Sequence, residues 1–325
     1  MKALVYQGNE TLAFRDVPEP KPSAGEELVR VEAAGICGSD MHAFLGHDAR
    51  RPPPLILGHE ASGTITDGPR DGSRVTINPL VSCGRCAACK GGRENLCPAR
   101  QIISMQPREG TFAQYVSVPA INLVEVPADV SFEKAALTEP LAVSWHSVRL
   151  GLAALSEGSG SSALVIGGGT IGFAASLALK AMGVADVTVA EPNAARAAFL
   201  ETLGEKVTTK PEGSWPLVVD AVGYAITRAT ASELSEPGGV IVHIGLGEDA
   251  GGLDIRRMTL QEITFIGTYT YTAEDFRDTA AAMFSGRLGP LDWVEQRPLA
   301  EGQQAFRDIQ SHKVAVPKII LSPWH

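Results

Sequence analysis

Short apolar runs separated by glycine and proline make up most of residues 1–143. Runs of this length between turn signals are typical of strands. A short helix is expected from Ser131 to Thr138, ended by Pro140, with another through residues 145–148. The pattern predicts an irregular, mostly antiparallel domain, with strands near residues 1–6, 27–33, 61–66, 74–77 and 111–118.

From residue 144 the pattern changes to apolar strands that alternate with helical stretches. Such alternation implies right-handed βαβ crossovers and a parallel sheet. Residues 203–217 leave room for a strand and a turn but not for a crossover helix, so we expect a trimmed doubly wound domain. Its strands are predicted at residues 163–165, 186–190, 217–220, 240–244 and 263–267, and its helices at 171–182 and 193–203. After it, a helix at 273–283 and a closing strand at 318–321 are expected.

Four of the five cysteines follow the spacing C-x2-C-x2-C-x7-C. Four thiolates this close in sequence can surround one Zn²⁺ and leave no open position, as in structural sites. Two disulfides are the alternative, but 325 residues with 44% hydrophobic content do not need them, and no signal segment precedes them. We therefore expect a structural zinc, with ligands Cys83, Cys86, Cys89 and Cys97.

The fifth cysteine, Cys37, is followed about twenty residues later by His59 and Glu60. One thiolate, one imidazole and one carboxylate leave a metal position open, which is typical of catalytic zinc. A lone cysteine is more often a buried core thiol. Its setting, GICGSDMH before GHE, favours the metal site.

Residues 167–172 match G-x-G-x-x-G between an apolar strand and an apolar helix. Gly167 permits a tight turn, Gly169 lets the backbone approach a pyrophosphate, and Gly172 allows close packing. Thr170 and Ile171 open the helix, whose free N–H groups favour an anion. The loop predicts a dinucleotide.

Glu191 stands nineteen residues beyond Gly172. A carboxylate there accepts hydrogen bonds from the ribose hydroxyls and repels a 2′-phosphate, which favours NAD over NADP. Arg196 keeps NADP as the alternative, because a guanidinium can serve a phosphate.

The net charge of −9 and the pI near 5.3 argue against a nucleic-acid partner. Apolar runs are too short to span a bilayer. The sequence predicts a soluble, cytoplasmic protein of a reducing compartment.

Taken together, GICGSDMH, LGHE, the cysteine quartet, TEPLAV and IGGGTIG, in this order along the chain, resemble the motifs of the zinc-dependent medium-chain dehydrogenases. The resemblance covers the whole chain and is strongest to the polyol dehydrogenase branch. It implies a GroES-like catalytic domain over residues 1–143 and 270–325 and a Rossmann NAD domain over residues 144–269. It also implies hydride transfer between NAD and a polyol or other secondary alcohol.

The resemblance makes Cys37 and His59 ligands of the catalytic zinc. Glu60 is either a ligand or lies just behind the metal. Glu139 occupies the position of a second cysteine in ordinary alcohol dehydrogenases, so it is either the fourth ligand or a partner of a water at the metal. Both carboxylates could instead form structural salt bridges.

Ser39 is expected to take the proton of the alcohol, and His42 to pass it to solvent through the nicotinamide ribose. The alternatives are a helix cap and a surface histidine. Phe44, Thr270 and Tyr271 are expected to line the substrate pocket, or to be ordinary packing. Thr270 replaces the arginine that sorbitol dehydrogenases carry, which disfavours sorbitol itself.

Two other functions fit the same motifs: dehydrogenation of an amino alcohol such as threonine or of a simple alcohol or aldehyde, and a non-catalytic nucleotide sensor. In proteins that the chain resembles, the strands matching residues 240–244 and 263–267 pair across a two-fold axis. We therefore expect a homodimer or homotetramer.

Overall fold

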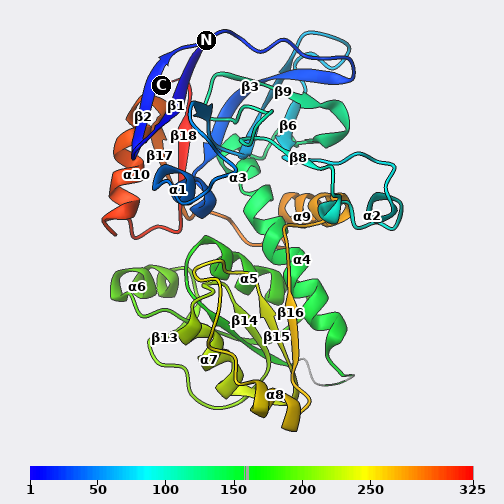
Figure 1. Ribbon diagram of the computed structural model, residues 1–325, viewed down its shortest axis with the longest axis vertical. Coiled ribbons are helices and arrows are strands. Elements are labelled where there is room, and N and C mark those ends of the chain that lie inside the picture. Colours follow the sequence, from blue (N-terminus) through cyan, green and yellow to red (C-terminus); the bar gives the residue numbers. More distant parts are fainter. Residues whose placement is uncertain (157, 159–160, 325) are drawn as a thin grey trace. The chain divides into compact units, whose positions relative to one another are not determined.

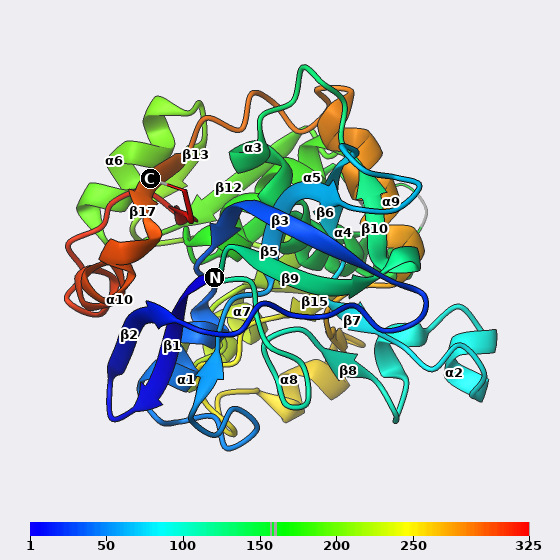
Figure 2. The same ribbon diagram turned by 90° about the horizontal axis from the view of Figure 1, so that it is seen from above.

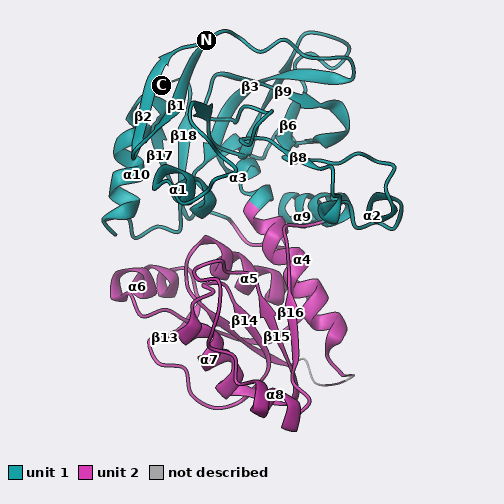
Figure 3. Cartoon of the chain, in the orientation of Figure 1, with its two compact units in different colours: residues 1–139, 272–285, 291–325 teal, residues 140–271, 286–290 magenta. Residues whose placement is uncertain are grey.

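The computed structural model describes residues 1–156, 158 and 161–324. The chain forms two compact units, coloured separately in Figure 3. Unit 1 contains residues 1–139, 272–285 and 291–325, and unit 2 contains residues 140–271 and 286–290. The expected fold class, an antiparallel β unit and a parallel α/β unit, is confirmed.

Unit 1 is built on a seven-stranded sheet in which β3 is the central member (Figure 1). β3 pairs antiparallel with β5, β9 and β18, and Figure 2 shows it running beside β9. A three-stranded sheet, β2-β1-β4, completes the β structure around the core. The strands are β1 Lys2–Gly8, β2 Thr11–Asp16, β3 Glu26–Gly35, β4 Leu55–Ile56, β5 Glu60–Thr66, β6 Arg74–Ile77, β9 Tyr115–Pro119, β10 Leu123–Glu125, β17 Val294–Pro298 and β18 Lys318–Ser322.

The ends of β3, β5 and β18 meet where the candidate metal residues lie. Gly35, the last residue of β3, pairs with Glu60 of β5 and with Ile320 of β18. Helix α1 (Gly38–Phe44) follows β3 directly. The register therefore brings three distant segments of the chain to one place.

A separate lobe of unit 1 carries the cysteine quartet. It consists of the two-stranded sheet β7 (Leu80–Val81) and β8 (Gln101–Ile102), helix α2 (Ala87–Lys90) and the 3-10 turn η1 (Glu94–Leu96). The side chain of Glu94 accepts a hydrogen bond from the backbone N–H of Ala273, at the start of α9 (Ala273–Phe284). The remaining helical segments of unit 1 are η2 Ala120–Asn122, α3 Phe132–Ala136, η3 Leu299–Glu301 and α10 Gly302–Gln310.

The expected break at Pro140 is wrong. Helix α3 ends at Ala136, and α4 (Thr138–Ala154) begins before the proline and continues through it. Pro140 lies in the first turn of α4, where a backbone N–H has no partner within the helix. The N–H that proline lacks therefore removes no helical hydrogen bond.

Unit 2 is a six-stranded parallel sheet in the order β13-β12-β11-β14-β15-β16. From β11 the strands β12 and β13 follow toward one edge of the sheet, whereas β14, β15 and β16 follow toward the other edge. This change in strand order between β11 and β14 is typical of a doubly wound fold. The structure describes every residue between β13 and β14, and none of them forms a helix. The expected absence of a crossover helix at this point is therefore confirmed. The elements are β11 Ser162–Ile166, α5 Thr170–Ala181, β12 Asp186–Ala190, α6 Ala194–Thr202, β13 Lys206–Thr208, β14 Trp215–Asp220, α7 Ala225–Leu234, β15 Ser235–His243, α8 Ile255–Leu260 and β16 Thr264–Gly267.

Among the described residues, none of the helices combines the length and apolarity that crossing a bilayer requires.

Candidate metal centres and dinucleotide loop

Cys37, His59 and Glu60 form one cluster in unit 1. Their ligand atoms lie within 4.8 Å of one another. Cys37 is the residue before α1, and His59 and Glu60 lead into β5. A soft sulfur, an imidazole nitrogen and a carboxylate oxygen at this separation suit one Zn²⁺ ion with room for a further ligand.

Asp40 is a residue of this cluster that the sequence patterns did not single out. Its carboxylate is fully buried. One oxygen accepts from the backbone N–H of Cys37 at 3.1 Å, and the other lies 3.4 Å from His59 Nδ1. A carboxylate on Nδ1 leaves Nε2 as the nitrogen that can bind metal, and it fixes the ring orientation. The feature of the sequence that could have revealed Asp40 is an acidic residue three positions after Cys37, in the first turn of α1.

The charges around His59 also indicate a cation site. Burial alone lowers the pKa of His59, but the negative charges of Asp40 and Cys37 raise it well above its ordinary value. Burial raises the pKa of Asp40, and the opposing charges of His59 and Arg51 lower it overall. The pocket therefore favours positive charge at the imidazole, whether a proton or a metal ion.

Glu60 is held by a second residue that the sequence did not reveal, Lys318 of β18. The Lys318 ammonium donates to both carboxylate oxygens of Glu60, at 2.7 and 2.8 Å, and to the backbone oxygen of Ile36 at 2.8 Å. Burial lowers the pKa of Lys318, but the charges of Glu60, Cys37 and Glu139 outweigh it and raise the pKa. Gly35 makes room for this pair, because a Cβ there would lie 2.2 Å from a Glu60 oxygen.

Glu139 is buried in the first turn of α4. Among the described residues it does not join the three-residue ligand cluster. Its charge nevertheless contributes to the raised pKa of Lys318.

The two predicted proton-transfer residues differ in their surroundings. Ser39 lies in the first turn of α1, with its hydroxyl 3.5 Å from His59 Nε2. It is not the helix cap, since the residue before α1 is Cys37. His42 lies one turn further and is exposed, with its ring 6.5 Å from that of His47.

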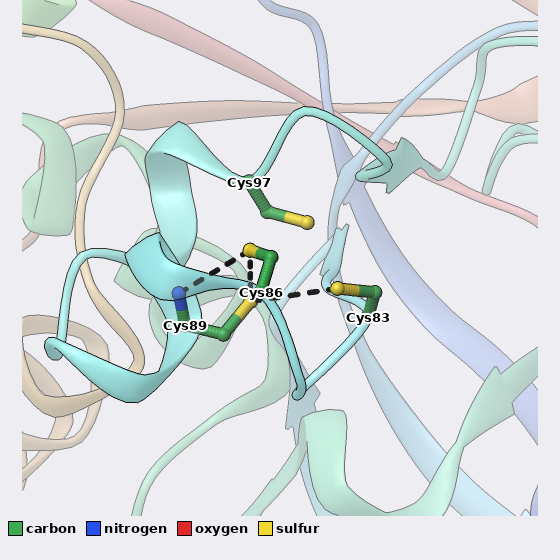
Figure 4. Close-up of side chains that lie close together, drawn as sticks. All are labelled: Cys83, Cys86, Cys89 and Cys97. Atoms are coloured by element: carbon green, nitrogen blue, oxygen red, sulfur yellow. Dashed lines mark hydrogen bonds between the residues drawn. The ribbon is translucent and has the colours of Figure 1, made fainter.

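The four remaining cysteines point their sulfur atoms toward a common centre (Figure 4). The Cys89 sulfur lies 3.4 Å from that of Cys86 and 3.9 Å from that of Cys83. Two sulfurs on a tetrahedral zinc are roughly 3.8 Å apart, whereas a disulfide requires about 2.05 Å. The sulfur positions fit one zinc ion and exclude disulfides, in agreement with five free cysteines.

The thiol acidities of the quartet show why a cation suits it. Backbone N–H groups of Arg85 and Cys86 donate to Cys83 and lower its pKa to about 6. Burial and the neighbouring thiols raise the pKa of Cys89 to about 11. Negative sulfur atoms this close together repel one another, so a cation among them stabilises the quartet.

In unit 2 the glycine loop joins β11 to α5. Gly167 has a φ of 98°, a conformation that favours glycine, and a Cβ at Gly172 would lie 1.7 Å from the Gly167 carbonyl oxygen. A Cβ at Gly169 would meet no atom within 4 Å. The open face at Gly169, before the first turn of α5 with Thr170 and Ile171, fits a pyrophosphate approached by the backbone.

Glu191 follows β12 and is buried. Its carboxylate accepts from the backbone N–H of Gly168 at 2.9 Å and of Asn193 at 2.7 Å, and Arg196 Nη1 donates to it at 3.4 Å. It thus ties the glycine loop to the start of α6. A carboxylate has about four acceptor positions, so it retains capacity for a ribose hydroxyl.

The three expected pocket residues have different environments. Phe44 is fully buried in the core of unit 1 against Phe306, which is ordinary packing. Tyr271 is also fully buried. Thr270 has a φ of 48°, unusual for a β-branched residue, and its buried hydroxyl has no hydrogen-bond partner among the described residues.

Family models match both halves of the chain. The alcohol dehydrogenase GroES-like domain matches residues 23–128, and the zinc-binding dehydrogenase domain matches residues 170–285. The chain is 32% identical to the L-galactonate-5-dehydrogenase of Escherichia coli K12, over 98% of each chain. It is 28% identical to the (R,R)-butanediol dehydrogenase of Saccharomyces cerevisiae, over 99% of this chain and 98% of that one.

Solved structures agree with these matches. An alcohol dehydrogenase (rspB) from Escherichia coli CFT073, complexed with NADH, superposes with a TM-score of 0.89 and 25% identity over 99% of both chains. Alcohol dehydrogenase TADH from Thermus sp. ATN1 has the same TM-score, identity and coverage.

Proposed function

The chain belongs to the zinc-dependent medium-chain dehydrogenase family, and we propose that it transfers a hydride between NAD and a polyol or another secondary alcohol. The observation that carries the proposal is the Cys37–His59–Glu60 cluster, whose ligand atoms lie within 4.8 Å of one another. It occurs in a chain whose other unit carries the dinucleotide loop. Relatives named L-galactonate-5-dehydrogenase and (R,R)-butanediol dehydrogenase, which match the chain over nearly its whole length, support this substrate class.

We assign Cys37 and His59 as ligands of the catalytic zinc, with Glu60 beside it and Glu139 as a further carboxylate near the cluster. When bound, zinc supplies a Lewis acid that lowers the pKa of a coordinated hydroxyl toward neutrality. Asp40 supports the ligand set by orienting His59. Lys318 compensates the charge of Glu60, so that the cluster does not accumulate uncompensated negative charge before it binds a cation.

Ser39 is the residue we assign to relay the substrate's proton, accepting it at the hydroxyl oxygen while its own hydroxyl proton passes on, because this hydroxyl lies 3.5 Å from His59 Nε2, at the edge of the cluster. His42 lies exposed on the same helix, and imidazoles serve as proton shuttles in proteins, so it suits the final transfer to water. The other zinc, held by Cys83, Cys86, Cys89 and Cys97, is structural because four thiolates leave no position for substrate.

For the cofactor, the residues we assign are Gly167, Gly169, Thr170, Ile171 and Gly172. Glu191 would accept from the adenosine ribose and exclude a 2′-phosphate. Arg196 is paired with Glu191 through the contact at 3.4 Å, so its charge is partly compensated. This pairing supports NAD rather than NADP.

For the substrate, Thr270 and Tyr271 remain the candidates, and Thr270 has the stronger support. Its strained backbone and unpartnered hydroxyl are features that concentrate at ligand-binding positions. A hydroxyl there suits a polyol oxygen.

The expected assembly is a homodimer or homotetramer formed through the edge strand β16. In unit 2 this strand has one sheet neighbour, β15, and Ile255 and Leu260 of the preceding helix are exposed. Five free cysteines support a cytoplasmic location, where thiols stay reduced.

The test is NAD reduction against a panel of polyols, secondary alcohols and threonine, with NADP in parallel. We expect turnover with NAD and a polyol or secondary alcohol, lost with a chelator and restored by Zn²⁺. A protein that contains two zinc ions and binds NADH but oxidises none of the panel would contradict the proposal and favour a sensor.

A further inference from the structure

Arg51 is a buried cation to which the proposed reaction assigns no role. Its side chain is 1% exposed, and a guanidinium so far from water requires nearly complete pairing. Nη1 donates to the Ser39 carbonyl oxygen at 2.7 Å, and Nε donates to the Ser104 carbonyl oxygen at 3.1 Å. Nη2 lies 3.4 Å from the Ser104 hydroxyl, and Nη1 lies 3.6 Å from a carboxylate oxygen of Asp48.

Arg51 contacts two serines, and the hydroxyl of each lies near a different nitrogen of the His59 ring. The Ser39 hydroxyl is 3.5 Å from His59 Nε2, and the Ser104 hydroxyl is 3.4 Å from His59 Nδ1. Ser39 belongs to α1, whereas Ser104 follows β8, so the chain reaches the ring from two separate segments. Arg51 is the side chain that spans them.

Ser104 is held in a conformation that it does not prefer. Its φ is 77°, in the left-handed region, and the residue is fully buried. Such a conformation costs on the order of 1–3 kcal/mol and persists only when its surroundings impose it. The contacts of Arg51 to both oxygens of Ser104 are constraints of that kind.

We propose that Arg51 is a positioning residue for the reaction, which holds Ser39 and Ser104 in place so that the His59 ring keeps one orientation and the Ser39 hydroxyl stays beside it. The inference rests on the proposed function, because it assigns His59 to the catalytic zinc and Ser39 to proton transfer. It adds a residue outside the ligand set that controls both.

The test compares Arg51→Met with Arg50→Met in the full chain. Both substitutions remove one positive charge from the same loop, but Arg50 is mainly exposed and its guanidinium pairs with Asp48. Two properties are measured: the affinity of the catalytic site for Zn²⁺, by competition with a chromophoric chelator, and the visible spectrum after Co²⁺ substitution. Steady-state kcat and KM for the best alcohol and for NAD complete the comparison.

We expect Arg51→Met to bind Zn²⁺ at the catalytic site about 10–100-fold more weakly, as for loss of other partners that orient a ligand. Its Co²⁺ spectrum should change, and kcat should fall more than KM for NAD rises. Arg50→Met should match the wild type in all three. Equal metal affinity, spectrum and kcat in Arg51→Met and Arg50→Met would overturn the inference.

Two further variants decide the matter if Arg51→Met does not fold. Arg51→Lys keeps the charge but replaces the guanidinium, which uses three nitrogens for these contacts, with a single ammonium nitrogen. Ser104→Gly removes the hydroxyl, and glycine suits the positive φ. Both should weaken metal binding in a protein with a normal circular dichroism spectrum, and wild-type affinity in both would refute the role. If the wild-type protein itself binds one zinc per chain, the proposed function fails instead.

Discussion

The ammonium of Lys318 lies within 2.8 Å of both carboxylate oxygens of Glu60, and each side chain is 1% exposed. The two residues are 258 positions apart, and they meet because β18 and β5 both pair with the end of β3. A buried ion pair contributes little net stability, but loss of one partner leaves an uncompensated charge. The pair therefore couples the C-terminal strand to the candidate metal cluster.

Lys318→Met should destabilise unit 1 by about 3–5 kcal/mol, because Glu60 is left buried without its cation. The double variant Lys318→Met/Glu60→Gln should recover part of the loss, since it removes the orphaned charge. The measurement is the urea midpoint of unfolding, followed by circular dichroism, for the two single variants and the double variant.

Lys134→Met is the matched control, because Lys134 pairs with Asp292 at 2.7 Å but the side chains are 36% and 65% exposed. An exposed pair contributes at most about 1 kcal/mol. If Lys318→Met were no more destabilised than Lys134→Met, Glu60 would have to be stabilised by something other than Lys318.

Cys37→Ala and Cys97→Ala should each lower the zinc content from two ions to one per chain, with opposite consequences. Cys37→Ala should keep its thermal stability and lose about 1000-fold in kcat, equivalent to several kcal/mol of lost transition-state stabilisation. Cys97→Ala should instead melt at a lower temperature than the wild type, because the lobe that carries the quartet is organised around the metal. Metal analysis with thermal melting checks both, and full zinc content in Cys37→Ala would place the catalytic ion elsewhere.

Gly169→Ala and Gly172→Ala should separate cofactor binding from folding. A methyl group at Gly169 meets no protein atom within 4 Å, so the variant should melt like the wild type but bind NADH at least about tenfold more weakly. At Gly172 the same methyl would lie 1.7 Å from the Gly167 carbonyl oxygen, so stability should fall as well. NADH fluorescence titration and thermal melting test the contrast, and normal NADH binding by a folded Gly169→Ala would mean that the pyrophosphate does not approach there.

Local chemistry explains what could be predicted from the sequence. The cysteine spacing and the glycine loop are contiguous motifs, so their ligand geometry depends on few distant contacts. The strands of the parallel sheet could be predicted because a strand that is buried on both faces is apolar throughout, as in Val240 to Val242.

What the sequence did not show depends on register between distant segments. Lys318 looks like an ordinary surface cation until β18 is placed beside β3, and Arg51 stands next to another arginine that is exposed. Helix α7 was not predicted, because its exposed face carries residues such as Ile226 and its buried face carries Arg228 and Ser232, which obscures the usual amphipathic pattern.

We expect Asp220 to make the stability of unit 2 sensitive to acid pH. Its fully buried carboxylate accepts from the backbone N–H groups of Val222 and Gly223 and lies 3.2 Å from His243 Nδ1. Burial raises the pKa of Asp220, but the hydrogen bonds and the charge of His243 outweigh it and lower the pKa below its ordinary value. A carboxyl group whose pKa is lower in the folded state than in the unfolded state stabilises the fold. This stabilisation is complete above the pKa of the unfolded state, about 3.9, and is lost as the pH falls through the pKa of the folded state.

Asp220→Asn should therefore be less stable than the wild type at pH 7, by about 1–3 kcal/mol, and should lose less on acidification below about pH 4. Unfolding midpoints at pH 7, 5 and 3.5 measure the difference, with Asp186→Asn as the control. Asp186 forms an exposed pair with Lys206 at 2.9 Å, with side chains 52% and 62% exposed, so it should change neither midpoint by much. Parallel acid curves for the wild type and Asp220→Asn would show that other carboxylates carry the acid sensitivity of the unit.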